Sequence, residues 1–406
     1  MKKPIVYVVI ALSIHLQALA QVQELRIQQH IKILSNDSLM GRGSGTSGEK
    51  MAAHYIKSKF SEFGLKPFGD GGTYLQTFPF KFGIHGTGRD GVATNVIGFI
   101  DNNADKTIVV GAHYDHLGLG YDQNSLDANP QDKIHNGADD NASGVAGVLE
   151  LARYFQHNSV SEKNNYLFIC FSGEELGLLG STYFTEHPAV DLNQINYMIN
   201  LDMIGRLNTA TGGLAVSGTG TSAAWEKAIK SISNNGMAIK TDSSGVGASY
   251  HTSFYLKNIP ALHFFTGSHS DYHKPSDDWD KINFTGEVAI LNYITQLIEE
   301  LDDQPKLVFL ATKNTSMGSA REFKVTMGIM PSYTSFEEGL RVDGVSEQKP
   351  AQKAGIKTGD LIIQVGDLKI KDIQDYMDAL GKFEKGQTVN VKVRRGSEVI
   401  TLPLTF

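Results

Sequence analysis

The sequence predicts an α/β sandwich with a mostly parallel, mixed central sheet flanked by helices, followed by a small β-rich C-terminal domain. Short uninterrupted apolar runs at 108–110 and 166–169 are typical of strands that are buried on both faces. Segments with apolar residues three to four positions apart alternate with these runs, which is typical of helices packed on a parallel sheet. From about residue 318 the pattern changes to strands with one short helix, which indicates a second domain.

The elements can be justified in chain order. Residues 21–64 are predicted to be helical with a Gly-rich connection at 41–48, and Gly64 supplies a stop signal. Strands are expected at Asn95–Ile100, Thr107–His113, Tyr166–Phe171, Tyr197–Leu201 and Ala261–Phe265. Helices are expected at Ala142–Gln156, Leu176–Glu186, Ser222–Asn234 and Thr285–Leu301. The first domain therefore spans 21–302, a polar linker 303–317, and the second domain 318–406.

Residues 1–20 have the pattern of a secretory signal peptide. Lys2 and Lys3 precede a mostly apolar run, and Ala18-Leu19-Ala20 fits a cleavage site before Gln21. The alternative is a membrane anchor, but the run is shorter than the roughly 20 residues that a span requires. We therefore expect an exported protein, periplasmic or secreted, with no membrane span after cleavage.

Composition excludes several classes of protein. Of the 406 residues, 41% are apolar, so the chain can build a core and is not a disordered one. The net charge of −7 argues against a general nucleic-acid binder, which needs a basic surface. A single cysteine, Cys170, excludes an intramolecular disulfide framework and a cysteine-only metal cluster. A metal site in this chain must use histidines and carboxylates.

Acidic and imidazole side chains occur where three of the expected strands end. In open α/β sheets, ligands bind outside the carboxyl ends of the strands. Three separate strands therefore bring such side chains to one edge of the sheet. These residues are His113, Asp115, Glu174, Glu175 and Asp202.

A pair of acids, Asp139 and Asp140, precedes the expected helix at 142–156. Like charges at such spacing repel unless a cation or proton compensates them, so a divalent metal is the simplest resolution. Each feature alone has a structural explanation: an Asp can cap a helix, a Glu pair can meet a helix dipole, and a single His can be structural. Their joint occurrence at strand ends favours a metal site.

Five motifs in this order resemble the M28 family of zinc-dependent exopeptidases, which includes bacterial aminopeptidases. The resemblance covers about residues 24–302 and implies a zinc-exopeptidase sandwich fold. The motifs are His113-x-Asp115, Gly137-Ala138-Asp139-Asp140-Asn141-Ala142-Ser143-Gly144, Glu174-Glu175, Asn200-Leu201-Asp202 and Asp271-Tyr272-His273-Lys274-Pro275.

The resemblance implies a site with two zinc ions. Asp140 matches the carboxylate that bridges them, His113 and Asp202 match the other ligands of one ion, and Glu175 and His273 match those of the other. It also implies a general base at Glu174, a second acid at Asp115 that orients His113, and an oxyanion-stabilising role for Tyr272. A cis peptide is expected between Asp140 and Asn141.

Two histidines with carboxylates form a ligand set that suits zinc, with manganese and cobalt as alternatives. Two ions together polarise a carbonyl and activate water, and a neighbouring carboxylate takes its proton. His251 and His269 compete with His273 for the last ligand position. His263 lies within an apolar strand and is interpreted as a core residue.

Residues 318–406 resemble a PDZ domain of the bacterial type, through Ala354-Gly355 and Gly359-Asp360. The resemblance implies a loop whose backbone amides hold the terminal carboxylate of a protein or peptide. Pro331, just after this loop, has no backbone N–H to donate to a bound peptide. The alternative is that the domain is a purely structural module. The loop residues are Met327, Gly328, Ile329 and Met330.

The sequence thus predicts an exported dizinc aminopeptidase that removes N-terminal residues from peptide substrates. Glutaminyl cyclases share the implied fold but use one zinc, so an acyltransferase of that type is an alternative. A catalytically inactive binding protein built around the PDZ-like domain is another. The presence of both Glu174 and Glu175 and of all five ligand positions favours hydrolysis.

Overall fold

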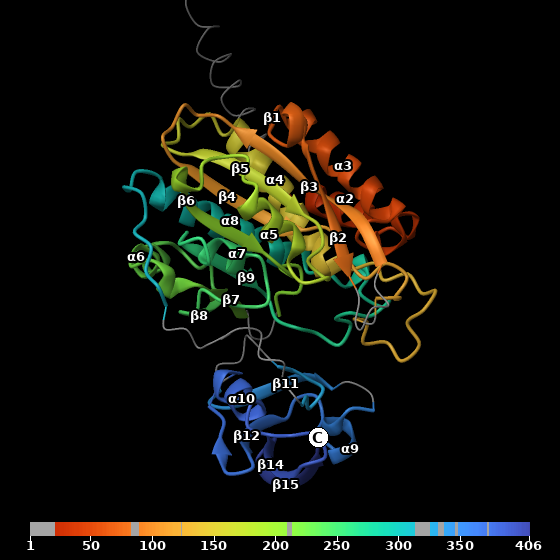
Figure 1. Ribbon diagram of the computed structural model, residues 1–406. Helices are drawn as coiled ribbons and strands as arrows, with labels where there is room; N and C mark the ends of the chain where they lie inside the picture. The colour runs from red at the N-terminus through yellow and green to blue at the C-terminus, as the bar shows by residue number, and fades with distance from the viewer. Residues whose placement is uncertain are drawn as a thin grey trace, which may run out of the picture.

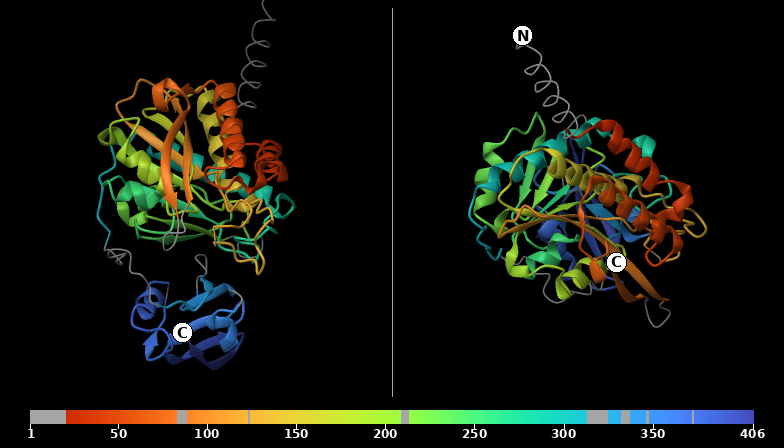
Figure 2. Two further views of the ribbon diagram at one scale, coloured as in Figure 1. Left: turned by 45° about the vertical axis from the view of Figure 1, so that its right-hand side comes forward. Right: turned by 90° about the horizontal axis from the view of Figure 1, so that it is seen from above.

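The computed structural model describes residues 21–82, 89–122, 124–208, 213–312, 325–331, 337–345, 348–371 and 373–406. The expected signal peptide, residues 1–20, lies outside the described residues. Residues 24–312 form a large domain in which helices cover both faces of a central sheet (Figures 1 and 2). The described residues from 325 onward form a small domain with its own hydrophobic core.

The central sheet has the strand order β1-β3-β5-β4-β6-β9-β7-β8, with β2 beside β3. Strands β5, β4, β6 and β9 run parallel, and every residue of β4, β5 and β6 is buried, as their apolar runs predict. Strands β1, β2, β7 and β8 were not predicted. The bounds are β1 (Lys66–Pro67), β2 (Leu75–Phe82), β3 (Arg89–Ile100), β4 (Thr107–His113), β5 (Asn165–Phe171), β6 (Ile195–Leu201), β7 (Gly213–Ser217), β8 (Ala238–Asp242) and β9 (Ala261–Phe265).

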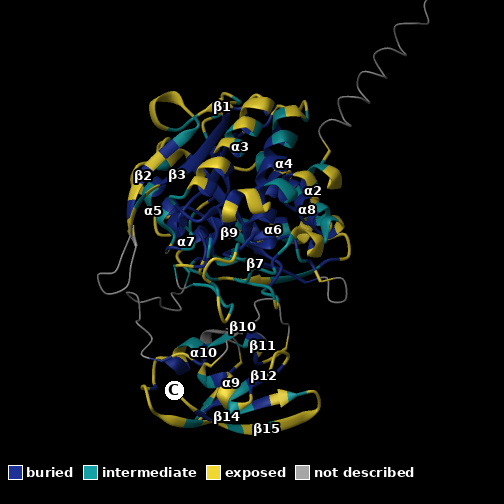
Figure 3. Ribbon diagram, turned by 90° about the vertical axis from the view of Figure 1, so that its right-hand side faces the viewer, coloured by how far each residue is buried: buried dark blue, intermediate teal, exposed yellow. Residues whose placement is uncertain are grey.

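Helices cover the sheet in two layers. One face packs against α2 (Glu24–Leu34), α3 (Ser47–Phe63), α4 (Gly144–His157), α6 (Ala224–Ser231) and α8 (Phe284–Asp302). The other face packs against α5 (Leu179–Glu186) and α7 (His251–Tyr255). Figure 3 shows buried residues in the sheet and exposed residues on outer helix faces.

Two helical predictions needed adjustment. The helical segment 21–64 is divided by a 3₁₀ turn at Asp37–Arg42, and Gly64 ends α3 with a φ of 86°. Helix α5 begins at Leu179 rather than Leu176, because Gly177 and Leu178 adopt positive φ angles of 106° and 61°. The Glu174–Glu175 pair therefore lies in a loop before the helix, and the explanation by a helix dipole is wrong.

A π-helical turn at Ala138–Ser143 leads into α4. The peptide bond between Asp140 and Asn141 within this turn is cis, as the family resemblance implied. The turn is buried throughout, so the side chain of Asp140 stands inside the domain at the sheet edge rather than on the surface.

The predicted linker 303–317 is partly wrong. Leu307 is buried in the core of the large domain, and the Leu310 N–H donates a hydrogen bond to the Thr221 carbonyl at 2.8 Å. The Thr312 N–H donates to the Tyr255 hydroxyl at 3.1 Å. Residues up to 312 therefore belong to the large domain, because the buried Leu307 side chain and these two hydrogen bonds attach them to it. Residues 313–317 lie outside the described part of the chain.

The small domain is a sheet of order β10-β11-β12-β14-β15, with β13 beside β12. The sequence predicted strands with one short helix for this domain, and the described residues form two helices, at Pro350–Ala354 and Ile373–Leu380. Among the described residues, no helix has the length and apolar character to cross a membrane. The elements are β10 (Ile329–Pro331), β11 (Leu340–Val345), α9 (Pro350–Ala354), β12 (Leu361–Val365), β13 (Leu368–Lys369), α10 (Ile373–Leu380), β14 (Thr388–Arg395) and β15 (Glu398–Thr405).

Candidate metal centre

The candidate centre lies at the carboxyl end of three adjacent parallel strands. His113 is the last residue of β4 and stands in register with Phe171, the last residue of β5. The loop after β5 carries Glu174 and Glu175, and Asp202 directly follows β6. The strand register therefore brings these residues to one edge, as the sequence predicted.

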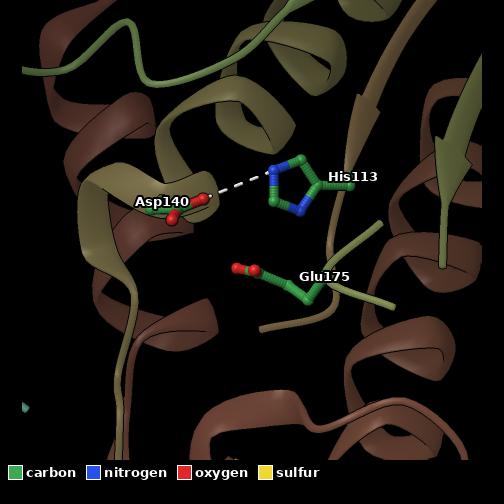
Figure 4. Close-up of side chains that lie close together, drawn as sticks. All are labelled: His113, Asp140 and Glu175. Atoms are coloured by element: carbon green, nitrogen blue, oxygen red, sulfur yellow. Dashed lines mark ion pairs between the residues drawn. The ribbon is translucent and has the colours of Figure 1, made fainter. Parts of the chain in front are cut away.

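Asp140 stands between two histidines. Its Oδ1 lies 3.4 Å from His113 Nε2, and its Oδ2 lies 3.2 Å from His273 Nε2. His113 Nε2 is also 3.4 Å from Asp202 Oδ1, and His273 Nε2 is 3.2 Å from Glu175 Oε2. The two oxygens of one carboxylate thus face two different pairs, which is the division expected of a bridging ligand. Figure 4 shows His113, Asp140 and Glu175 converging.

The donor set fits divalent cations. Two ligands of one tetrahedral zinc stand about 3.3 Å apart when each bond is about 2.0–2.1 Å long. The four nitrogen–oxygen separations of 3.2–3.4 Å match this spacing. Ligand atoms of His113, Asp140 and Glu175 also lie within 4.8 Å of one another. Among the described residues, buried Asp140 Oδ2 has no hydrogen-bond partner, so a cation would satisfy it.

The carboxylates set the charge of the histidines. Burial lowers the pKa of His113, but the negative charges of Asp202 and Glu174 outweigh it and raise the pKa well above its ordinary value. Burial likewise lowers the pKa of His273, and Glu175 and Asp140 raise it well above the ordinary range. The surroundings therefore favour positive charge at this edge, whether it is carried by protons or by metal ions.

The five side chains differ in their exposure. Only 2% of the His113 side chain and 4% of the Asp140 and Glu175 side chains are exposed, against 13% for Asp202 and 14% for His273. The accessible side of the cluster is therefore the side of Asp202 and His273.

Glu174 stands beside the cluster without belonging to either pair. Burial raises the pKa of Glu174, and the charges of Glu175, Asp202 and Asp115 add to this against the opposing effect of His113. A carboxylate with a raised pKa is a stronger base, so its environment suits a proton acceptor.

Asp115 contacts its neighbours differently from the expectation. The Nδ1 atom of His113 lies 3.1 Å from the backbone carbonyl oxygen of Asp115 and 3.8 Å from its carboxylate. The nearer acceptor for the imidazole N–H is thus the carbonyl. The carboxylate instead accepts hydrogen bonds from the Ser44 hydroxyl at 2.7 Å and the Glu174 N–H at 3.1 Å.

A chain of polar side chains behind Asp202 was missed by sequence reasoning. The Ser249 hydroxyl donates to Asp202 Oδ2 at 2.7 Å, and the Asn200 amide donates to Ser249 Oγ at 2.6 Å. Asn200 also contacts His263 Nδ1 at 2.9 Å, and His251 stacks on the His263 ring. His263 thus has a polar partner inside the domain, and His251 does not join the ligand cluster.

His273 is held by the loop that precedes the π-helical turn. Its Nδ1 donates to the Asn124 carbonyl oxygen at 2.7 Å, which leaves the lone pair of Nε2 facing the carboxylates. The Leu126 N–H donates in turn to the His273 carbonyl at 2.9 Å. Tyr272 stacks on the His273 ring with centroids 3.9 Å apart. Nothing in the sequence of the loop signals these backbone contacts.

His269, the other competing histidine, faces a different pair of acids. Its Nε2 lies 3.2 Å from Asp139 Oδ2 and 4.0 Å from Asp277 Oδ1. Asp277 Oδ2 accepts the backbone N–H groups of both Asp139 and Asp140 at 3.0 Å. This cluster therefore supports the backbone of Asp140 from behind.

Arg42 is buried beneath the centre and bonds to the backbone of the loops that carry it. Burial lowers the pKa of Arg42 to about 10 against the opposing carboxylates of Asp115 and Asp140, so it stays charged at neutral pH. One signal was available: a single arginine within the Gly-rich connection at 41–48. The guanidinium donates to the carbonyl oxygens of Leu34, Tyr114, Asn136 and Gly137.

The PDZ-like loop is described in part. Met327 is buried and its carbonyl accepts the Ala351 N–H at 2.8 Å. Gly328 has a φ of 72°, and its N–H donates to Thr326 Oγ1 at 3.0 Å. Ile329 and Met330 begin β10, and the side chain of Met330 lies outside the described part.

Two family models match this chain. The model of peptidase family M28 matches residues 95–298, and that of the PDZ domain matches residues 321–405. Leucine aminopeptidase 2 of Trichophyton equinum is 28% identical over 194 residues. The match covers 45% of this chain and only 38% of that protein.

Two solved structures have similar folds. A zinc aminopeptidase from Bacillus subtilis is similar with a TM-score of 0.56 and 19% identity, over 71% of this chain and 98% of that one. The glutaminyl cyclase of Bacteroides thetaiotaomicron gives 0.56 and 20%, over 71% and 100%. The family model spans half of the sequence. This chain therefore belongs to peptidase family M28, and it carries a PDZ domain after the peptidase domain.

Proposed function

We propose that this protein is an exported aminopeptidase that holds two zinc ions. His113 and Asp202 would hold one ion, Glu175 and His273 the other, and Asp140 both. The observation that carries the proposal is the division of the Asp140 carboxylate between two histidines, 3.4 and 3.2 Å away. The donor chemistry supports zinc, as does the similarity in fold to a zinc aminopeptidase.

When bound, two zinc ions polarise the scissile carbonyl and lower the pKa of a water molecule. Glu174 takes the proton from this water and delivers it to the departing amine. The carboxylate of Asp115 accepts a hydrogen bond from the backbone N–H of Glu174 at 3.1 Å and so holds this residue in place. Tyr272, beside His273, is assigned to donate a hydrogen bond to the carbonyl oxygen as negative charge develops on it.

The direction of cleavage is assigned from the relatives. Five carboxylates lie at or beside the proposed centre, but the two zinc ions and the buried guanidinium of Arg42 would offset their charge, so charge alone does not select one end of a peptide. Relatives named as aminopeptidases, including leucine aminopeptidase 2, carry the assignment. We therefore assign removal of the N-terminal residue from peptides. The five carboxylates are Asp115, Asp140, Glu174, Glu175 and Asp202.

The deciding experiment measures zinc content per chain together with hydrolysis of aminoacyl anilides, each with a free and an acetylated amine. Two zinc ions and cleavage of only the free-amine substrates are expected. Cleavage of only the blocked ones would overturn the aminopeptidase assignment. One zinc ion with cyclisation of N-terminal glutamine would instead indicate the glutaminyl cyclase reaction, a candidate because of the similarity in fold.

Export and peptide capture complete the proposal. Residues 1–20 are assigned as a signal peptide, and N-terminal sequencing of protein from the culture medium or periplasm should begin at Gln21. The PDZ domain is assigned to capture the C-terminal carboxylates of peptides or proteins. The hydrolytic role rather than an inactive binding role is supported by the presence of all five ligands and Glu174 in one cluster.

A further inference from the structure

A third imidazole, that of His116, lies against the candidate centre. His116 follows β4 by three positions, and 2% of the residue is exposed. Its backbone N–H donates to the Arg42 carbonyl at 3.2 Å, and it forms a parallel β-bridge with Gly43. The loop bearing His116 is thus fixed to the segment beneath the centre.

The imidazole contacts one oxygen of Glu175. His116 Nδ1 lies 2.8 Å from Glu175 Oε1, whereas Glu175 Oε2 lies 3.2 Å from His273 Nε2. The two oxygens of this carboxylate therefore face different histidines. Because one oxygen is engaged by His116, rotation of the Glu175 carboxylate is restricted, and the other oxygen is presented to the His273 pair.

We propose that His116 is a positioning residue for Glu175: its Nδ1–H donates to Oε1 and aims Oε2 at the ion shared with His273. The inference rests on the proposed two-zinc function and adds a residue to it. Partners that orient the first ligands of a metal commonly change metal affinity 10- to 100-fold when removed.

The distances distinguish this role from that of a further metal ligand. The four histidine–carboxylate pairs of the proposed ligands are separated by 3.2–3.4 Å. His116 Nδ1 instead lies at hydrogen-bond distance, 2.8 Å, from Glu175 and 3.8 Å from Asp140 Oδ2. The geometry is that of a donor to a ligand.

Packing fixes the ring in this orientation. Gly137 has a φ of 55°, and a Cβ built on it would lie 2.5 Å from the Cδ2 atom of His116. The ring also meets the His273 ring edge to face, with centroids 5.9 Å apart. Among the described residues His116 Nε2 has no hydrogen-bond partner, so Nδ1 makes the specific contact.

Three substitutions at this position separate the roles. In His116→Asn the side-chain amide stands near the position of Nδ1 and can still donate to Glu175. In His116→Gln the amide reaches the position of Nε2 instead, and His116→Leu has no donor. The exposed His187, changed to Leu, is the matched control, since it stacks on Tyr183 on the surface.

The primary readout is calorimetric titration of the metal-stripped protein with zinc, with the melting temperature of each metal-free form as a check on folding. The wild type should bind two ions. His116→Leu and His116→Gln should bind one of them about 10-fold or more weakly and the other normally, whereas His116→Asn should stay within about threefold. Among the three variants, kcat should fall as the affinity of the protein for the more weakly bound zinc ion falls.

Two results would overturn the inference while leaving the proposed function intact: wild-type affinity for both ions in His116→Leu, or a loss in His116→Asn as large as in His116→Gln. The comparison of Asn with Gln still decides if the Leu variant does not fold. A wild type that binds fewer than two zinc ions would overturn the proposed function, and this inference with it.

Discussion

The carboxylate of Asp115 accepts the backbone N–H of Glu174 at 3.1 Å. Through this bond the loop that follows β4, directly after the proposed ligand His113, is tied to the loop that follows β5, which carries the proposed base. Ser44 donates to the other oxygen of the same carboxylate at 2.7 Å. The base and the first ligand are therefore held at a fixed distance by one buried acid.

Replacement of Glu174 by Gln should strongly reduce turnover without changing the zinc content. The amide keeps the shape of the side chain but cannot take a proton, so kcat should fall by about 100-fold or more. Steady-state hydrolysis of leucyl-p-nitroanilide, with zinc content per chain as the control, tests this. Near-normal kcat in the variant would remove Glu174 from the role of base.

Single ligand substitutions should separate the two halves of the centre. His273→Ala should lose the ion shared with Glu175 and keep the one at His113, because only Asp140 is common to both pairs. His113→Ala should show the reverse pattern, and Asp140→Ala should bind both ions poorly. Elemental analysis after dialysis gives the count. Equal loss in all three variants would contradict a shared Asp140.

Replacement of Arg42 by Met should destabilise the large domain. The guanidinium is the donor for four backbone carbonyl groups, and each buried carbonyl left unpaired costs about 1–3 kcal/mol. The free energy of unfolding should fall by about 3 kcal/mol or more, measured by urea denaturation. Lys227→Met, on the exposed side of α6, is the control and should change it by less than about 0.5 kcal/mol.

Replacement of Glu287 by Gln should stabilise the protein increasingly as the pH rises. The residue is fully buried in α8, and neither carboxylate oxygen has a hydrogen-bond partner among the described residues. Burial, with smaller effects of Asp139 and Glu150, raises the pKa of Glu287 well above 4.5. The protonated Glu287 side chain therefore contributes fully to stability at a pH below 4.5, the ordinary pKa of glutamate, and this contribution is lost as the pH rises through the raised pKa.

Because glutamine does not titrate, the Glu287→Gln variant lacks this loss. Its stability relative to wild type should be constant at acidic pH and then grow by up to about 1.4 kcal/mol per pH unit above the ordinary glutamate pKa. Denaturation of both proteins in a series of buffers from pH 4 to pH 8 measures the difference. Glu186→Gln, at the exposed end of α5, should show a flat difference, and a flat line for Glu287→Gln would be a contradiction.

Removal of the PDZ domain after residue 312 should leave hydrolysis of small substrates intact and weaken the binding of long peptides. The large domain has its own core, which includes Leu307, so hydrolysis of small anilides should continue. For peptides of ten or more residues, kcat/KM should drop while kcat stays the same, since the lost contacts are made equally in the ground state and the transition state. Equal kcat/KM for long peptides in both forms would leave the domain a structural role.

Much of the fold was predictable because it depends on local pattern. The buried strands β4, β5 and β6 are continuous apolar runs, and their ends carried three of the five proposed ligands, so the edge of the sheet and the positions of His113, Glu175 and Asp202 could be predicted. Strands β7 and β8 were missed because they are short and bounded by polar residues. The start of α5 was misplaced because Leu178 adopts a left-handed conformation that leucine rarely takes.

The supporting residues could not be predicted for a different reason. Arg42, Ser249 and Asn124 act through contacts with residues 8 to 149 positions away, several of them through backbone atoms, and no spacing rule connects them. The same holds for the His113 imidazole, whose nearer acceptor is a carbonyl oxygen rather than the expected carboxylate. Sequence patterns indicate which side chains have the right chemistry, and only the folded chain decides which atom of each is used.

The wide spacing of the ligands along the chain has a consequence for the cell that makes this protein. Along the chain, His113 is the first of the five proposed ligands and His273 is the last. Asp277, which accepts the backbone N–H of Asp140, comes later still. A nascent chain still short of these last positions has an incomplete centre. If the proposed function holds, hydrolytic capacity must arise late in synthesis, in a single step, and any fragment cut between these positions and released should be inert.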